Sequence, residues 1–187
     1  MQIDWRLGYA DDITLDRIKT SHPIIRRELL EDYLYANTML LGKGVRLRFS
    51  WVYRSPEIQN KLYNQRPRVT KAKAWQSVHQ YGLAFDIVLL YDNDGNGTFE
   101  EASWDTVRDG DRDGIADWLE ITKYFESKGY QNGFLRNGKK WDLPHFQKDF
   151  GLGWRDMNDK IKNNQYSVET IDGVEYKWID ILKENYV

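Results

Sequence analysis

A carboxylate stands at the start of an apolar run in the stretch SVHQYGLAFDI, residues 77–87. Asp86 is followed directly by the sequence IVLL, a pattern typical of a buried strand. An unpaired charge in a buried strand is costly, so the fold has to supply Asp86 with a positive partner. His79 lies seven residues upstream and is the first candidate for a site shared with Asp86.

Hydrophobic patterns elsewhere predict both helices and strands. Helices are expected over residues 21–42, with Ser21 as N-cap and Pro23 in the first turn, over 56–65 with Ser55 as cap, and over 115–129. Strands are expected over residues 45–53 and 83–90 and around Pro144, and a hairpin over 168–182 with its turn at Asp172 and Gly173. This order predicts the α+β class, with a small antiparallel sheet flanked by helices.

The length of 187 residues suits one domain, expected over residues 1–187, with an insertion at about 92–120. Eight tryptophans and twelve tyrosines provide enough apolar area for a core. The formal net charge of −2 gives no strong field for nucleic acid or an anionic membrane, so neither is expected as a partner. A monomer is expected.

The chain has no cysteine, so any metal has to be bound by His, Asp or Glu. No stretch approaches the ~18 apolar residues of a membrane span. The N-terminal sequence MQIDWRLGYADD has no apolar signal region. We therefore expect synthesis in the cytoplasm without a signal peptide.

Two of the three histidines lie near an aspartate. His79 precedes Asp86, and His145 follows Asp142 by three residues in WDLPHFQ. Two imidazole nitrogens, one carboxylate oxygen and an open fourth position are typical of a catalytic zinc site, and Asp142 would be its general base. From spacing alone, ordinary core or surface histidines and an ion-paired aspartate explain the pattern as well. The third histidine, His22 at a helix start, is predicted to be a surface residue.

The sequence resembles the M15 family of zinc peptidases, which includes D-Ala-D-Ala carboxypeptidases, VanX-type dipeptidases and phage L-alanyl-D-glutamate endopeptidases. The family pattern S-x-H-x-x-G-x-A-x-D, followed later by [DE]-x-x-H, is matched by Ser77, His79, Gly82, Ala84, Asp86, Asp142 and His145. An upstream YRS…Q…L segment is matched by Arg54, Ser55, Gln59 and Leu62. The resemblance covers about residues 45–150 and implies a hedgehog/D,D-peptidase-like fold.

The resemblance also implies a role for each matched residue. The implied zinc ligands are His79, Asp86 and His145. Asp142 would be the catalytic base, Arg54 would stabilise the oxyanion or hold the substrate, and Ser77 would hydrogen-bond the substrate. An ion-pairing Arg54 and a turn residue at Ser77 are the plain alternatives, and Gln59 is interpreted as structural. The implied activity is that of a zinc metallopeptidase, a hydrolase of peptidoglycan stem peptides.

The identity of the base narrows the subclass, because the phage endopeptidases more often have Asp at the position of Asp142 and the dipeptidases typically have Glu. This favours an L-alanyl-D-glutamate endopeptidase that acts like an endolysin, released to the cell wall by a holin or by lysis. Two alternatives remain. One is a D,D-carboxypeptidase or dipeptidase on the same scaffold, and the other is a non-catalytic metal-binding module that recognises the cell wall.

Residues 109–120, DGDRDGIADWLE, match the twelve-residue EF-hand calcium loop D-x-[DN]-x-[DN]-G-x5-E. The expected calcium ligands are Asp109, Asp111, Asp113, the carbonyl of Ile115, Asp117 and Glu120. Five acidic side chains so close together would repel one another without a cation. A solvated acidic loop is the alternative interpretation.

A second, weaker match covers residues 92–103, with Asp92, Asp94, Asn96 and Thr98 as possible calcium ligands. Ser103 stands where the terminal glutamate of the pattern belongs. Both loops lie between Asp86 and His145 in the sequence. We therefore expect a calcium-organised loop that lines the substrate groove beside the zinc site.

Overall fold

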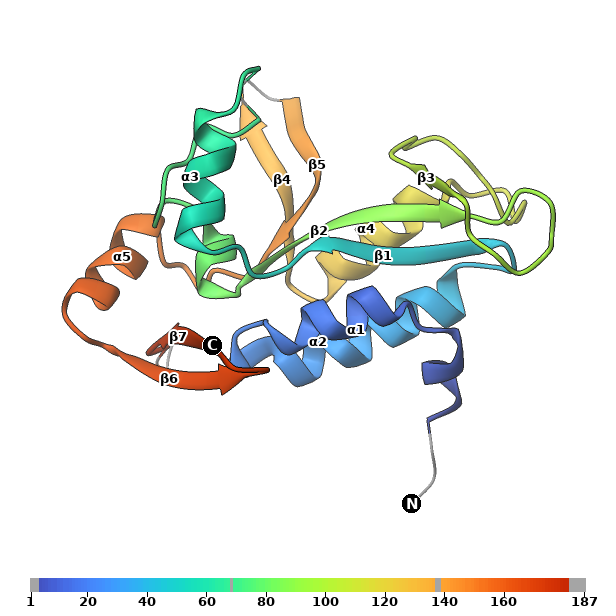
Figure 1. Cartoon of the computed structure of the whole chain (residues 1–187). Helices are drawn as coiled ribbons and strands as arrows, with labels where there is room; N and C mark the ends of the chain where they lie inside the picture. Colours follow the sequence, from blue (N-terminus) through green and yellow to red (C-terminus); the bar gives the residue numbers. More distant parts are fainter. Residues whose placement is uncertain (1–3, 68, 137–138, 182–187) are drawn as a thin grey trace.

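The computed structural model describes residues 4–67, 69–136 and 139–181 (Figure 1). The α-helices are α1 (Asp12–Lys19), α2 (Pro23–Tyr35), α3 (Pro56–Asn64), α4 (Asp117–Ser127) and α5 (Trp154–Lys162). The strands are β1 (Val45–Trp51), β2 (Ala84–Tyr91), β3 (Glu101–Ser103), β4 (Gln131–Arg136), β5 (Lys139–Gln147), β6 (Tyr166–Ile171) and β7 (Val174–Ile179). The short helical segments are η1 (Trp5–Tyr9), η2 (Ala36–Leu40) and η3 (Val78–Tyr81). The expected α+β class is confirmed.

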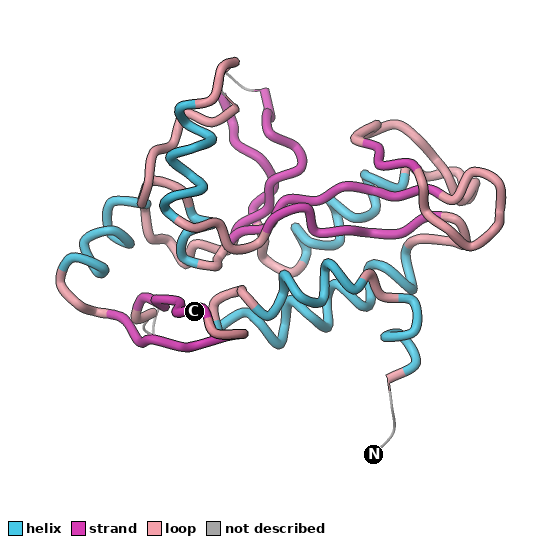
Figure 2. The backbone as a smooth tube through the Cα atoms, viewed as in Figure 1, coloured by secondary structure: helices cyan, strands magenta, loops and turns pink. Residues whose placement is uncertain are grey.

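Strand β2 is central to the main sheet, whose order is β1-β2-β5-β4 with every pair antiparallel. Strand β1 pairs with β2 along residues Asp86 to Tyr91. Strand β5 pairs only with the first residues of β2 and places His145 opposite Asp86. Strand β3 pairs with the far end of β2, and β6 and β7 form a separate hairpin (Figure 2). The start of β2 is therefore enclosed by strands on both sides.

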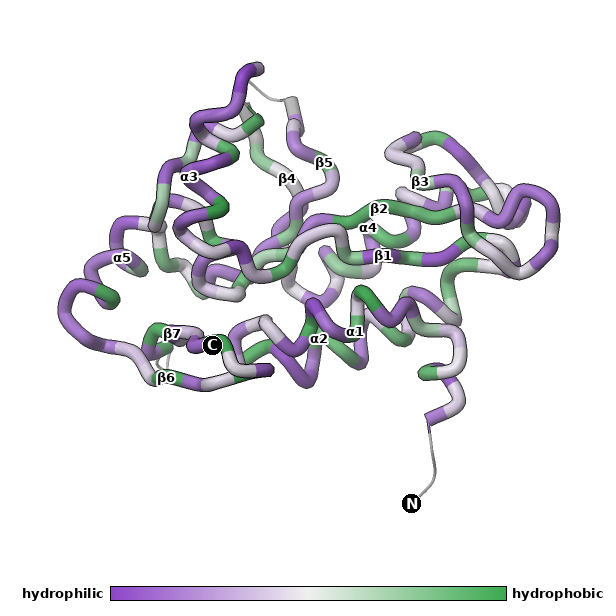
Figure 3. Tube along the Cα trace, viewed as in Figure 1, coloured by the Kyte–Doolittle hydropathy of each residue, from purple (hydrophilic) through white to green (hydrophobic). Residues whose placement is uncertain are grey.

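The alternation of side chains along β2 explains how the strand carries a carboxylate. Phe85, Ile87 and Leu89 are fully buried in the hydrophobic core, together with residues of α2 and α4. Phe85 also stacks on Phe49 of β1, with ring centroids 4.4 Å apart. Asp86 belongs to the opposite face of β2, although most of the strand is strongly hydrophobic (Figure 3). The charge therefore points away from the core.

Helix α2 begins differently from the sequence prediction. Its N-cap is His22 and not Ser21, whose hydroxyl donates to the carbonyl of Ile18 instead. The Nδ1 atom of His22 accepts the Ile24 N–H at 3.1 Å, and Nε2 donates to the Ile179 carbonyl at 2.9 Å. His22 is only 6% exposed, so its expected surface position is wrong, because the β6–β7 hairpin covers it.

Two other local predictions agree with the structure. Ser55 caps α3 by accepting the Ile58 N–H, and the β6–β7 hairpin turns at Asp172 and Gly173. Both turn residues have positive φ angles, 51° and 79°, as a two-residue turn of type I′ requires. The single domain over residues 1–187 stays a prediction. Among the described residues, no helix combines the length and apolar character that a membrane crossing requires.

The buried His22 generates a pH prediction. Burial lowers the pKa of His22, so below the unfolded-state value of about 6.5 the unfolded chain binds a proton that the folded chain does not. Its contribution to stability is therefore complete above that pH and is lost as the pH falls towards the folded-state pKa. The wild type should lose more unfolding free energy between about pH 8 and 5.5 than His22→Asn.

Asparagine retains an N-cap acceptor, so the variant should be destabilised at high pH by only about 1 kcal/mol, from the lost bond to Ile179. Denaturant unfolding of both proteins across the pH series, at matched metal content, measures the difference. Equal pH slopes for the two proteins would contradict the assignment.

Candidate active site

A cavity of about 730 Å³ opens beside the start of β2. Segments before and after α3, the helical turn η3, strand β5 and the start of α5 form its wall. The candidate zinc, catalytic and substrate-binding residues from the sequence all line it: Arg54, Ser77, His79, Asp86, Asp142 and His145. The structure thus brings together residues that are up to 91 positions apart in the chain.

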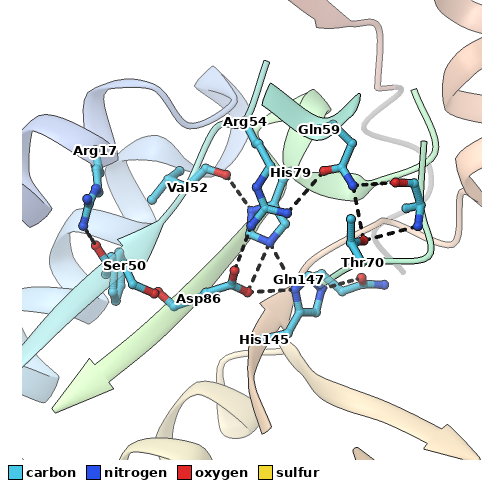
Figure 4. Close-up of polar contacts among 12 residues, drawn as sticks. Arg17, Ser50, Val52, Arg54, Gln59, Thr70, His79, Asp86, His145 and Gln147 are labelled. Carbon is cyan, nitrogen blue, oxygen red and sulfur yellow. Dashed lines mark hydrogen bonds and ion pairs between the residues drawn. The ribbon is translucent and has the colours of Figure 1, made fainter. Parts of the chain in front are cut away.

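Three side-chain atoms converge at the base of this cavity (Figure 4). His79 Nε2 lies 3.2 Å from Asp86 Oδ1 and 3.2 Å from His145 Nδ1, and the last two atoms are 3.1 Å apart. Three ligands of a tetrahedral zinc ion, each ~2.0–2.1 Å from the metal, are separated by about 3.3 Å. The residues therefore fit a metal ion of this size and geometry.

Neighbouring groups fix the tautomer of each histidine. His79 Nδ1 donates to the Val52 carbonyl at 2.7 Å, and His145 Nε2 donates to Gln147 Oε1 at 2.9 Å. Gln147 is itself oriented, because its amide nitrogen donates to Asp149 at 2.8 Å. In the neutral rings the protons occupy these outer nitrogens, so the inner nitrogens present lone pairs to Asp86. Such outer hydrogen bonds are the usual way in which metal-binding histidines are oriented.

The centre attracts positive charge. Burial lowers the pKa of His79, whereas for His145 burial is outweighed by the hydrogen bond and charge of Asp86, which raise its pKa. Burial alone would raise the pKa of Asp86, but the two histidines outweigh it and lower that pKa. A proton and a metal ion therefore compete for the same position, and metal affinity should fall as the pH is lowered.

Arg54 holds the other oxygen of Asp86. Its Nη2 donates to Asp86 Oδ2 at 3.1 Å, and its Nη1 donates to Gln59 Oε1 at 3.2 Å. Gln59 is fully buried and donates to the Ala72 carbonyl at 2.7 Å, in agreement with its structural interpretation. The guanidinium has five N–H donors, so donors remain for a group in the cavity beyond these two contacts. Burial lowers the pKa of Arg54.

A bulge in β5 directs Asp142 into the cavity. The β4–β5 register shifts between Asn132 and Phe134, and Asp142 has a positive φ of 57°. Asn132 secures the bulge, because its amide donates to the Leu143 carbonyl at 2.7 Å and to the His145 carbonyl at 3.1 Å. Bulges beside active sites commonly redirect a side chain in this way.

Gly133, opposite the bulge, also has positive φ, and a Cβ there would lie 2.6 Å from the Trp141 carbonyl oxygen. Desolvation by the cavity wall and the negative charge of Asp86 raise the pKa of Asp142. A carboxylate with a raised pKa is a better proton acceptor, as general-base catalysis requires.

Sequence reasoning missed three contributors to this site: the Val52 carbonyl, Gln147 and Asn132. No sequence signal marks a backbone carbonyl as a partner of His79. Gln147 had a signal, because residues i and i+2 of a strand share a face and it stands two positions after His145. Asn132 had none, because its partners depend on the β4–β5 register.

The acidic loops lie elsewhere. The cavity wall contains none of residues 92–120, which follow the far end of β2 (Figure 1). Asp86, near the start of β2, and Tyr91, at its end, are about 17 Å apart at ~3.3 Å per residue. The expected position of these loops beside the zinc site and along the groove is therefore wrong. The loops follow Asp86 closely in the sequence, but β2 leads away from the cavity and carries them to its far end.

Within each loop the structure does bring acidic groups together. Oxygens of Asp92, Asp94 and Glu100 lie within 4.8 Å of one another. The same holds for Asp109, Asp111 and Asp117, and for Asp111, Asp113 and Glu120. In the first loop, Thr98 donates its N–H to Asn96 at 2.7 Å.

The chain is similar to known peptidases. A family model described as D-alanyl-D-alanine carboxypeptidase, from the M15 peptidases, matches residues 70–148. The chain is also 33% identical over 132 residues to the peptidoglycan L-alanyl-D-glutamate endopeptidase CwlK of Bacillus subtilis (strain 168). That alignment covers 67% of this chain and 72% of the Bacillus protein.

The orienting role of Gln147 can be tested with a metal ion. Gln147→Leu leaves the Nε2–H of His145 without its acceptor, so affinity for a divalent ion should fall about 10–100-fold. Competition between the protein and a chromogenic chelator for Zn²⁺ measures this affinity. Gln131→Leu, which removes only the 3.4 Å contact to the Gln147 amide, is the matched control and should bind almost as tightly as the wild type. Equal affinities for all three proteins would exclude the orienting role.

Proposed function

Because this chain belongs to the M15 family of peptidases, we propose that it is a zinc-dependent hydrolase of peptidoglycan stem peptides, and specifically an L-alanyl-D-glutamate endopeptidase. One observation carries the proposal. The lone pairs of His79, Asp86 and His145 converge at the base of an open cavity, and Asp142 lines the same cavity.

Zinc is the proposed metal because the donor set suits it. Two imidazole nitrogens and one carboxylate oxygen leave a fourth tetrahedral position open, as catalytic zinc sites do. The absence of cysteine thiolates is compatible with this, since many catalytic zinc sites use nitrogen and oxygen ligands only. A zinc ion bound there would act as a Lewis acid and lower the pKa of a water molecule to about 7.

The residues of the chain provide the proton transfers and the positioning. Water attacks the carbon of the scissile amide, and Asp142 accepts the proton that the water releases. Asp142 then returns the proton to the nitrogen as the carbon–nitrogen bond breaks, which gives a carboxylate and an amine. Arg54 donates a free N–H to the developing oxyanion or to a substrate carboxylate. Ser77 hydrogen-bonds the peptide backbone from the cavity wall.

Two observations support the endopeptidase over other peptidases. Asp142, and not a glutamate, occupies the position of the base. The Bacillus relative bears the name of an L-alanyl-D-glutamate endopeptidase. The second candidate is a D,D-carboxypeptidase or dipeptidase, which the description of the matching family model favours.

The proposal includes where the protein is made and how it reaches the cell wall. An endolysin-like protein would be made in the cytoplasm and would reach the cell wall when a holin or lysis opens the membrane. The monomeric state and the absence of a nucleic-acid partner stay predictions.

The bond that is cleaved can be read from the products. Mass spectrometry of purified peptidoglycan after digestion by the zinc-loaded protein should detect stem peptides with a new N-terminal D-glutamate. Loss of only the terminal D-alanine would replace the endopeptidase with the carboxypeptidase. Unchanged walls of several types, with zinc shown to be bound, would favour the non-catalytic recognition module and overturn the proposal.

The role of Asp142 has its own test. Asp142→Asn removes the proton acceptor while it preserves size, so turnover should fall by at least about 10²-fold. Zinc content should stay near that of the wild type, because Asp142 is not one of the three converging ligands. Asp180→Asn, an exposed residue outside the cavity wall, is the matched control and should retain full activity. Full activity in Asp142→Asn would remove this residue from its assigned role.

A further inference from the structure

The acidic loop of residues 109–120 is the strongest feature that the proposed peptidase does not use. Two groups of carboxylates share it. Oxygens of Asp109, Asp111 and Asp117 lie within 4.8 Å of one another, and so do those of Asp111, Asp113 and Glu120. No lysine or arginine of the described residues forms an ion pair with any of these five side chains.

A second observation concerns Asp117, which is fully buried. Its Oδ2 accepts the Tyr91 hydroxyl and the Gly110 N–H, each at 2.8 Å. Its Oδ1 is buried and has no hydrogen-bond partner. The same is true of Glu120 Oε2. A buried charged oxygen without a partner costs several kcal/mol unless a cation or a hydrogen bond compensates it.

We propose that residues 109–120 bind a calcium ion, with oxygen ligands from five acidic side chains and the Ile115 carbonyl. The ligands are Asp109, Asp111, Asp113, Asp117 and Glu120. Calcium takes six to eight oxygen ligands in flexible geometry, which the two overlapping carboxylate groups offer, whereas magnesium demands a tighter octahedron and keeps several waters. The absence of nitrogen and sulfur donors argues against zinc at this position.

The electrostatics of Glu120 agree with this assignment. Burial and the charges of Asp113 and Asp111 raise the pKa of Glu120 to about 7. The carboxylates therefore repel one another strongly in the absence of a cation.

Residues 109–120 are attached to the core at two points. These two contacts determine which elements a bound calcium ion would hold together. Asp117 begins α4 and bonds Tyr91, the last residue of β2. Asp111 accepts the N–H of Gly42, just after η2, at 2.7 Å. A Cβ on Gly42 would lie 2.5 Å from Asp111 Cβ, so the contact is close. Calcium would therefore tie the N-terminus of α4 to β2 and to the end of η2.

The consequence is a stabilised fold. Helix α4 contributes Trp118, Ile121 and Phe125 to the hydrophobic core. An ion that orders the start of this helix stabilises the folded state by mass action. The effect does not require contact with the cavity, from which residues 109–120 are absent.

The loop of residues 92–103 has no comparable second observation. Asp92, Asp94 and Glu100 come together, but among the described residues of this loop no buried carboxylate oxygen lacks a partner. Calcium binding there stays a prediction from the sequence.

The test uses the full-length protein, stripped with a chelator and reloaded with one equivalent of zinc. Isothermal titration calorimetry with CaCl₂ should show saturable binding. The melting temperature should rise by about 5–10 °C when free calcium exceeds the dissociation constant about a hundredfold. Neither readout involves catalysis, so failure of the proposed peptidase activity leaves this test intact.

Variants locate the site. Glu120→Gln should weaken calcium binding at least tenfold and lose most of the thermal shift at the same calcium concentration. Glu126→Gln, on the exposed side of the same helix, makes the same chemical change and should retain both. Asp109→Asn, which keeps one oxygen acceptor for the N–H of Asp113 or of Gly114, serves as a second variant if Glu120→Gln does not fold.

Two results would overturn the proposal. One is an unchanged melting temperature of the wild type at about 10 mM calcium, above the dissociation constants of the weakest calcium modules. The other is a calcium-dependent rise in melting temperature in Glu120→Gln or Asp109→Asn that is as large as in the wild type. If Glu100→Gln loses that rise instead, the ion binds to the loop of residues 92–103.

Discussion

Three lone pairs that meet at one point are the constraint on which the rest of this structure depends. His79, Asp86 and His145 lie 3.1–3.2 Å from one another, and none of the three inner atoms carries a proton when the rings are neutral. Lone pairs this close repel one another, and a proton or a metal ion between them relieves the repulsion. The Val52 carbonyl and Gln147 hold the rings in that orientation, so the surrounding fold keeps the three lone pairs directed at one point, as the proposed metal ion requires.

Strand β2 links the cavity to the acidic loop of residues 109–120 and keeps the two apart. Asp86 lies near its start, and Tyr91 at its end donates to Asp117 of the acidic loop. The residues of the opposite face, Phe85, Ile87 and Leu89, are fully buried and anchor the strand in the core. One strand therefore reaches both proposed sites, and the distance between them separates the proposed chemistry at the cavity from the proposed stabilisation at the loop.

The bulge in β5 points the carboxylate of Asp142 into the cavity. A regular antiparallel ladder would alternate Asp142 and His145 across opposite faces of the sheet, because they are three positions apart. The register shift opposite Asn132 and Gly133, with the positive φ of Asp142, lets both side chains line one cavity. The backbone departs from regular geometry where the proposed chemistry requires it.

The sequence by itself determined the α+β class, the cap at Ser55, the turn at Asp172, and six residues that line the cavity: Arg54, Ser77, His79, Asp86, Asp142 and His145. These features depend on local propensity and on motifs whose spacing is visible in one dimension. It did not determine that His22 is buried, because a hairpin more than 140 residues away covers it. Nor did it place residues 92–120 away from the cavity, since the direction of β2 exists only in the folded sheet. The tertiary structure decided these points because burial and strand register depend on contacts between distant segments.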